Sequence, residues 1–135
     1  SLFIQANLRE ADLRNADLRD CHLNDANLVK ARLHDADLTS AHRDGFTVVN
    51  LANFEGADLH NAKLSNVSAQ DANFRNANLS GVDFTDAVLG GAILRGANVT
   101  DTNFQGVELG SVTMEFANFS KALNAKVPSY KKNLR

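Results

Sequence analysis

A five-residue pattern of apolar and polar positions runs through most of the chain. Over residues 6–38 a leucine recurs at every fifth position, an alanine usually stands two residues before it, and Asp or Asn usually lies between them. Such leucines would scatter around an α-helix, advancing about 140° per repeat, and would alternate between the faces of a straight strand. The pattern therefore predicts short extended segments joined by turns, with the alanine and the leucine of each segment facing inward.

Stacking these segments coil on coil would enclose a narrow core. The five-residue rhythm continues from Val49 to Phe119, with bulky residues at the leucine position and small ones two positions earlier. Small and bulky side chains at alternate inward positions can fill a narrow lumen without voids. Coils stacked in this way lie about 4.8 Å apart, which is the spacing of paired strands.

The tandem A(D/N)LXX units are similar to those of the pentapeptide-repeat proteins. That resemblance implies an all-β fold, a right-handed quadrilateral parallel β-helix with four pentapeptides in each coil. For this chain it predicts about six coils over residues 1–119. Residues 120–135, where the rhythm fades, are expected to form a short C-terminal cap or tail, and their sequence is compatible with a helical turn.

The rhythm fails after Leu38 and returns at Val49, which predicts a bulge or loop near residues 41–46. Its residues His42, Arg43, Asp44 and Gly45 include an Asp-Gly turn signal. A loop on a regular scaffold suits recognition, but a tolerated insertion explains the break equally well. If the broken unit still forms one side of a coil, one inward column contains Leu13, Leu33, Phe54, Phe74, Leu94 and Met114.

Composition narrows the possible functions. The 135 residues form one domain with a net charge of −2 and interspersed signs, so nucleic acid is not an expected partner. Cys21 replaces an alanine of the repeat and is expected in the core. No apolar run reaches the length of a membrane span and no signal peptide is present, which predicts a soluble, cytoplasmic protein. Export or organelle targeting stays open because Ser1 need not be the native start.

The repeat begins abruptly, with Phe3 already in the leucine position. An uncapped coil presents unpaired backbone groups. We therefore expect a fragment of a longer protein, a cap supplied by a partner, or self-association at this end.

No catalytic or cofactor-binding motif emerges from the sequence. Gly90-Gly91 lacks the strand-to-helix context and the lysine of a phosphate-binding loop. The recurring Asp and Asn residues suit backbone hydrogen bonding at turns, which the fold requires in every repeat. We therefore predict no enzyme activity, catalytic residue, cofactor, metal ligand or small-molecule substrate.

One surface departs from the polar pattern. By register, Val88, Gly90, Gly91 and Ile93 point outward, and Val48 and Leu51 are expected lower on the same side. A flat apolar patch suits docking of a protein partner or of a second copy. Singly exposed apolar residues are also normal on protein surfaces, so both interpretations stay open.

These observations favour a non-enzymatic scaffold that presents flat faces to a protein partner. The resemblance offers an alternative, because some pentapeptide-repeat proteins mimic DNA and modulate type II topoisomerases. Such mimicry requires a strongly negative surface, and a net charge of −2 counts against it.

Overall fold

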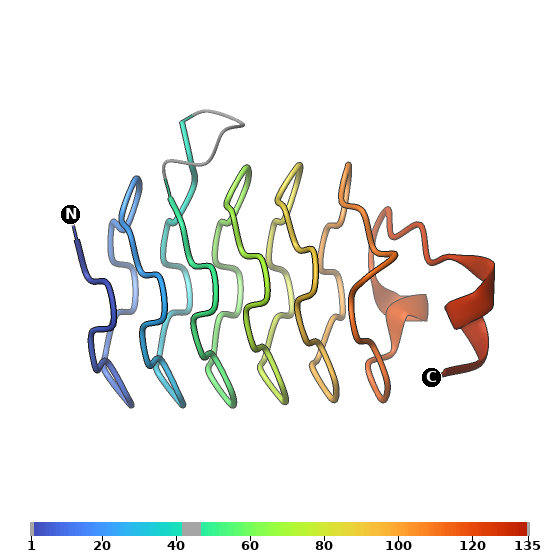
Figure 1. The fold of residues 1–135 in the computed structure, drawn as a ribbon, viewed down its shortest axis with the longest axis horizontal. Coiled ribbons are helices and arrows are strands. Elements are labelled where there is room, and N and C mark those ends of the chain that lie inside the picture. Colours follow the sequence, from blue (N-terminus) through green and yellow to red (C-terminus); the bar gives the residue numbers. More distant parts are fainter. Residues whose placement is uncertain (1, 42–46, 135) are drawn as a thin grey trace.

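The computed structural model describes residues 2–41 and 47–134, which wind into a rod of stacked coils (Figure 1). Parallel bridges join each coil to the next. In the first coil Leu2 pairs with His22, and the next three bridges start at Asn7, Asp12 and Asp17. Four bridges in one coil define four sides, which we call faces 1 to 4 after these four residues in order. Each pentapeptide therefore supplies one side of the rod.

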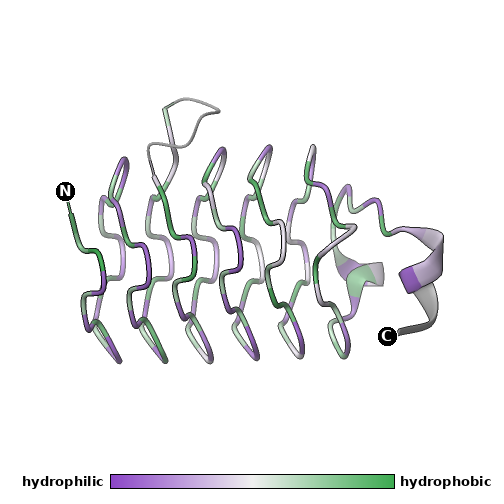
Figure 2. Cartoon of the chain, in the orientation of Figure 1, coloured by the Kyte–Doolittle hydropathy of each residue, from purple (hydrophilic) through white to green (hydrophobic). Residues whose placement is uncertain are grey.

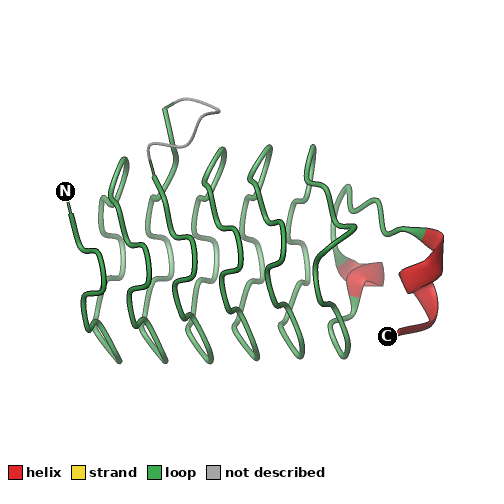
Figure 3. Ribbon diagram, viewed as in Figure 1, coloured by secondary structure: helices red, strands yellow, loops and turns green. Residues whose placement is uncertain are grey.

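Regular secondary structure is sparse in the part of the chain that the structure describes. Each face contributes one bridging residue per coil, so the pairing forms columns of single bridges and not continuous strands. The helices are two 3₁₀ helices near the C-terminus, η1 (Phe119–Lys121) and η2 (Ser129–Leu134), drawn red in Figure 3. The coils of the rod are thus built from turns and single bridges.

The corners of the rod require left-handed backbone. The second residue after the inward leucine has φ near +60°, as at Asn15 (60°) and Asp71 (58°), and Gly91 has φ 74°. Glycine reaches this region without steric cost, and Asn and Asp tolerate it better than other residues. This requirement explains why Asp, Asn and Gly recur at the last position of the repeat.

The Asp or Asn before the inward leucine has a different task. Its side-chain oxygen accepts a hydrogen bond from the backbone N–H two residues later, as from Glu55 to Asn53 (3.0 Å) and from Gln105 to Asn103 (3.0 Å). The repeat thus satisfies its own turn locally. The predicted structural role of these residues is confirmed.

Inward residues fill the lumen as the pattern predicts, while hydrophilic residues alternate with them along the coils (Figure 2). Every predicted inward position from Thr47 to Phe119 is buried. Phenylalanine rings make a continuous run of contacts through this lumen, with centroid distances of 4.9 to 5.9 Å along Phe54, Phe74, Phe84, Phe104 and Phe119. Cys21 is buried as expected.

The break in the rhythm adds residues to one coil. His22 bridges to Val48, 26 positions on, whereas Leu2 bridges to His22, 20 positions on. The prediction that the broken unit forms one side is therefore wrong. Leu33 N–H donates to Asp58 O (2.7 Å), so the inward residue above Leu33 is Leu59 and not Phe54. This coil therefore contains six more residues than the coil before it, while its four sides are formed by residues outside the break.

Buried hydroxyl groups connect the described residues on the two sides of the break. Thr47 N–H donates to Ser40 Oγ (2.7 Å), and Asp20 N–H donates to Thr47 Oγ1 (2.7 Å). Both Ser40 and Thr47 are buried. Their hydroxyls replace backbone partners that a regular coil would provide. The column of bridges on face 1 therefore continues across the break, from His22 to Val48.

Candidate functional site

The predicted interaction residues fall on two faces. Val48, Leu51, Val88, Gly90 and Gly91 all belong to face 1, since Val48 and Val88 both bridge to Ser68. Ile93 bridges to Asn73 and lies on face 2. The structure thus gathers five of the six residues on one face. His42, Arg43, Asp44 and Gly45 lie outside the described residues.

Face 1 differs from the other faces in charge. From Leu2 to Gly90 the positions directly before and after the inward residue of face 1 carry no Asp, Glu, Lys or Arg. Leu51 (57 % exposed) and Val88 (40 % exposed) add apolar surface, and Asp25 and Asp71 border the face at its corners. The outward residues of this stretch are Leu2, Ile4, His22, Asn24, Val48, Asn50, Ser68, Gln70, Val88 and Gly90. The sequence pattern predicted the apolar residues of face 1, but it did not reveal that this face has fewer charged side chains than the others.

Charged residues occupy the other three faces and are often paired. On face 3 the Arg14 guanidinium donates two hydrogen bonds to Asp12 (2.7 and 2.6 Å), which hold the pKa of that carboxyl well below its usual range. On face 4 Arg19 binds Asp17 in the same way and lowers the pKa of Asp17 to about 2. Arg95 lies 3.5 Å from Glu115 on face 2. These faces are solvated, mutually compensating surfaces.

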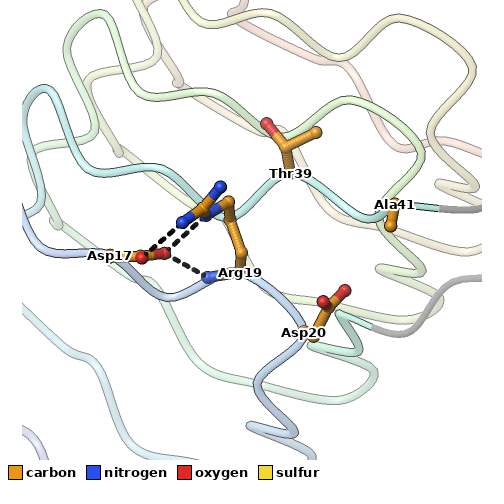
Figure 4. Close-up of a pocket in the computed structure, with 5 residues that line it drawn as sticks. All are labelled: Asp17, Arg19, Asp20, Thr39 and Ala41. Atoms are coloured by element: carbon orange, nitrogen blue, oxygen red, sulfur yellow. Dashed lines mark hydrogen bonds and ion pairs between the residues drawn. The ribbon is translucent and has the colours of Figure 1, made fainter.

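An open pocket of about 470 Å³ lies beside the Asp17–Arg19 pair (Figure 4). Asp20, Thr39 and Ala41 complete its lining. The guanidinium of Arg19 is already held by Asp17, as the dashed lines of Figure 4 show. Among the described residues that line it, the pocket therefore offers no free cation to a ligand.

A second hollow interrupts face 1 itself. Between the coil that begins at Val88 and the one that begins at Glu108, a cavity of about 400 Å³ is lined by residues of both coils. The first part of the last coil, orange in Figure 1, leaves the regular spacing of the earlier coils. We call this hollow the face-1 groove. Its lining includes Val88, Leu89, Gly90, Glu108, Gly110 and Ser111.

The bridge column of face 1 stops at this groove. Ala69 N–H donates to Val88 O (2.8 Å), and Val88 N–H donates to Val67 O (2.9 Å). The corresponding bonds one coil later would join Glu108 to Ala87 and Leu89, and neither forms among the described residues. Sequence reasoning missed the groove. Its one signal was glycine at the same outward position of two consecutive coils, Gly90 and Gly110.

Nothing in the described residues forms a recognisable catalytic centre. Within residues 2–41 and 47–134, no group of three or more His, Cys, Asp or Glu side chains could hold a metal ion. Burial raises the pKa of the Cys21 thiol, which disfavours the nucleophilic thiolate. No helix in the same residues is long and apolar enough to cross a membrane.

The four-sided coils and their repeat define the class of protein. The pentapeptide repeats family matches residues 3–42, 52–91 and 83–120, in eight copies, and this chain belongs to that family. Solved structures of the family imply a right-handed quadrilateral β-helix. A comparison with curated proteins gave no match.

Three solved pentapeptide repeat proteins resemble the chain. The first is HetL from the cyanobacterium Nostoc sp. strain PCC 7120, involved in heterocyst differentiation regulation, with 26% identity and a TM-score of 0.43 over 93% of this chain and 67% of HetL. The second is Rfr23 from the cyanobacterium Cyanothece 51142, with 34% identity and a TM-score of 0.46 over 76% of this chain and 63% of Rfr23. The chain thus spans about two thirds of these two relatives.

The third is a protein of the Arabidopsis thaliana thylakoid lumen, with 21% identity and a TM-score of 0.61 over 90% of this chain and 89% of that protein. At this identity the likeness shows a shared fold. Membership of the family therefore identifies the architecture of the chain and does not identify a partner.

Proposed function

We propose that this chain is a non-enzymatic scaffold that binds a protein partner through face 1. In this proposal the scaffold is a right-handed rod of about six coils, with residues 120–135 as its cap. The observation that carries it is the absence of charge directly before and after the inward residues of face 1 between Leu2 and Gly90, while the same positions on the other faces hold Asp, Glu, Lys and Arg. Depletion of charged residues at its centre is what distinguishes an interface from the rest of a protein surface.

The shape of face 1 supports the same use. Its bridging residues repeat at strand spacing, so its backbone is flat, and Gly90 adds no side chain above it. Apolar side chains at Val48, Leu51 and Val88 are separated by the small or amide residues Ser68 and Gln70. Such a surface can be dehydrated at lower cost than one that carries ions.

The distribution of charged side chains on the surface disfavours the alternative function, a DNA mimic. A mimic needs a surface of one sign, whereas Asp12 and Asp17 are neutralised by Arg14 and Arg19 on their own faces. The net charge of −2 points the same way.

The test places two negative charges on face 1, away from the groove. Partners are captured from the source cells by cross-linking, identified by mass spectrometry and rebound in purified form to Val48→Asp/Leu51→Asp. We expect this variant to bind at least about ten-fold more weakly than the unaltered protein, because two carboxylates would be dehydrated in the interface. Self-association is followed in parallel by analytical ultracentrifugation.

A matched control adds the same charge elsewhere. Asn98→Asp/Gln105→Asp alters exposed positions on faces 3 and 4, and we expect binding within about two-fold of the unaltered protein. Equal loss in both double variants, or unchanged binding in both, would exclude face 1 as the docking surface.

A further inference from the structure

We infer that the face-1 groove binds an extended peptide segment of a partner protein through backbone pairing with residues 87–89. The inference deepens the proposed function, on which it rests, by naming the kind of segment that docks. It starts from backbone groups of two residues that line the groove, the carbonyl of Ala87 and the N–H of Leu89.

The two residues are almost fully buried, and these two groups have no protein partner among the described residues. Ala87 is 4 % exposed and Leu89 is 1 % exposed. Among the described residues, no donor reaches Ala87 O and no acceptor reaches Leu89 N–H. Buried backbone groups are nearly always hydrogen-bonded, and leaving one unpaired is costly. Two residues that line the groove therefore hold an unpaired donor and an unpaired acceptor.

Their geometry specifies what that partner must be. One coil earlier, the single residue Val88 donates its N–H to Val67 O (2.9 Å) and accepts from Ala69 N–H (2.8 Å). Ala87 and Leu89 are the equivalents of Val67 and Ala69. They are thus arranged to pair with both backbone groups of one residue in an extended chain that runs parallel to them.

Hydrogen bonds close both ends of the groove. At one end Asp86 N–H donates to Gln105 O (2.8 Å), which continues the regular ladder. At the other, Gly91 N–H donates to Ser111 Oγ (3.0 Å), a side-chain bond in place of a backbone one. The last coil is also tied outward, because Tyr130 Oη donates to Gly110 O (3.1 Å). These contacts hold the groove open over a few residues, the length of a short peptide segment.

Two glycines remove side chains from the mouth of the groove. Gly90 and Gly110 do not have the left-handed backbone that favours glycine. A Cβ at Gly90 would meet Ser111 Oγ at 3.8 Å, and one at Gly110 would meet Tyr130 Oη at 3.5 Å, both ordinary contacts. Neither the backbone nor packing therefore requires glycine here. A glycine of this kind is typical of a site where another backbone approaches closely.

The groove also constrains the side chains of its occupant. Val88 offers an apolar wall, and Glu108 is the charged outward residue in the lining from the opposite coil. We therefore expect a segment with a Lys or Arg facing Glu108, a small or apolar residue against Val88, and no proline at the pairing position, since proline has no N–H.

The first measurement is amide hydrogen exchange in the free protein. Leu89 N–H should exchange at least about 100-fold faster than Ala69 N–H, its paired equivalent. Equal protection of the two amides would show that Glu108 closes the ladder in solution, and would overturn the inference.

The second measurement is selection from a displayed library of linear dodecapeptides. Selected peptides should be enriched in Lys or Arg, lack proline at the pairing position and slow the exchange of Leu89 N–H. Gly90→Val should weaken their binding at least about ten-fold by filling the groove mouth. The control Gln70→Val, at the same outward position one coil earlier where the ladder is intact, should bind within about two-fold.

The outcomes separate this inference from the proposed function. The inference about the groove would be overturned if the library yielded no binding peptide. It would also be overturned if the selected peptides bound Gly90→Val as well as the unaltered protein. Self-association that Gly90→Val abolishes, without any selected peptide, would make a second copy the occupant and overturn it too. If partner binding still depends on Val48 and Leu51 in either case, the scaffold function stands without the groove.

Discussion

Replacing Phe74 by alanine tests the packing of the lumen most directly. The ring is fully buried. It stacks on Phe54 with a centroid distance of 4.9 Å and an interplanar angle of 6°, and meets Phe84 edge-on at 5.9 Å. The substitution removes the central ring of three without altering an outward side chain.

The expected loss of unfolding free energy is about 3–5 kcal/mol, the range for a buried Phe→Ala change. The upper half of the range applies here because the cavity cannot collapse easily. Short ladder bonds hold the coils on both sides, from Phe54 N–H to Asn73 O (2.7 Å) and from Phe74 N–H to Ile93 O (2.7 Å). Each lost aromatic pair contributes about 0.5–1.5 kcal/mol within that total.

Urea unfolding followed by circular dichroism measures this loss. The slope of free energy against urea should stay constant, because a changed slope would mean that the coils on either side unfold separately. Phe116→Ala is the matched control: this ring is 71 % exposed and stacks on the Arg95 guanidinium at 4.6 Å. It should cost no more than about 1 kcal/mol, the value of an exposed cation–π contact. Equal losses in the two variants would refute the inward assignment of Phe74.

Three further predictions concern single positions. Leu51→Asn should stabilise the fold by about 0.5–1 kcal/mol in the same urea assay, because Leu51 has φ 63° and Asn tolerates this region better; a loss of stability would contradict the strain. Asp17, whose pKa the hydrogen bonds from Arg19 lower to about 2, should add stability that is lost as pH falls from about 4 to about 2, and Asp17→Asn should flatten this decline. Native Cys21 should react with Ellman's reagent only on unfolding, because burial raises the pKa of its thiol; rapid native reaction would show an exposed thiol.

The sequence predicts the repeating part of the fold well because one physical rule governs it. Inward residues must alternate with turn residues every five positions, and the buried positions from Thr47 to Phe119 follow that rule without exception. The stacking across the break was predicted wrongly. Counting positions cannot distinguish a side of a coil from an excursion that supplies no side. Leu33 lies beneath Leu59 because the ladder of hydrogen bonds, and not the rhythm alone, decides the register.

The candidate site was predicted only in part, for a related reason. The register of the repeat shows which apolar residues point outward, so Val48, Leu51 and Val88 were correctly placed on one face. Ile93, which was predicted on the same side, lies on face 2. The groove depends on two hydrogen bonds that fail to form beside Leu89. The residues on either side of it keep the five-residue pattern, so periodicity gives no sign that the coils part.

Face 1 also departs from the rules that the rest of the rod obeys. On the other faces an Asp or Asn usually precedes the inward residue and caps its own turn, as Asn53 does for Glu55 N–H, although Arg32 and Lys63 replace it in two coils and Ile93 and Thr113 in two more. Face 1 has His22, Val48, Ser68 and Val88 at that position in successive coils and forgoes those local hydrogen bonds.

At a corner of the same face, Leu51 adopts a left-handed conformation that suits glycine or asparagine better. A hydrogen bond forgone lowers stability by about 0.5–1.5 kcal/mol where no other acceptor replaces it; after Ser68, Gln70 N–H donates to Asn50 Oδ1 instead (2.8 Å). Local rules broken without a folding benefit are expected where a surface serves a function. These departures are concentrated on face 1, which has few charged residues and contains the groove, in keeping with the proposed docking of a partner there.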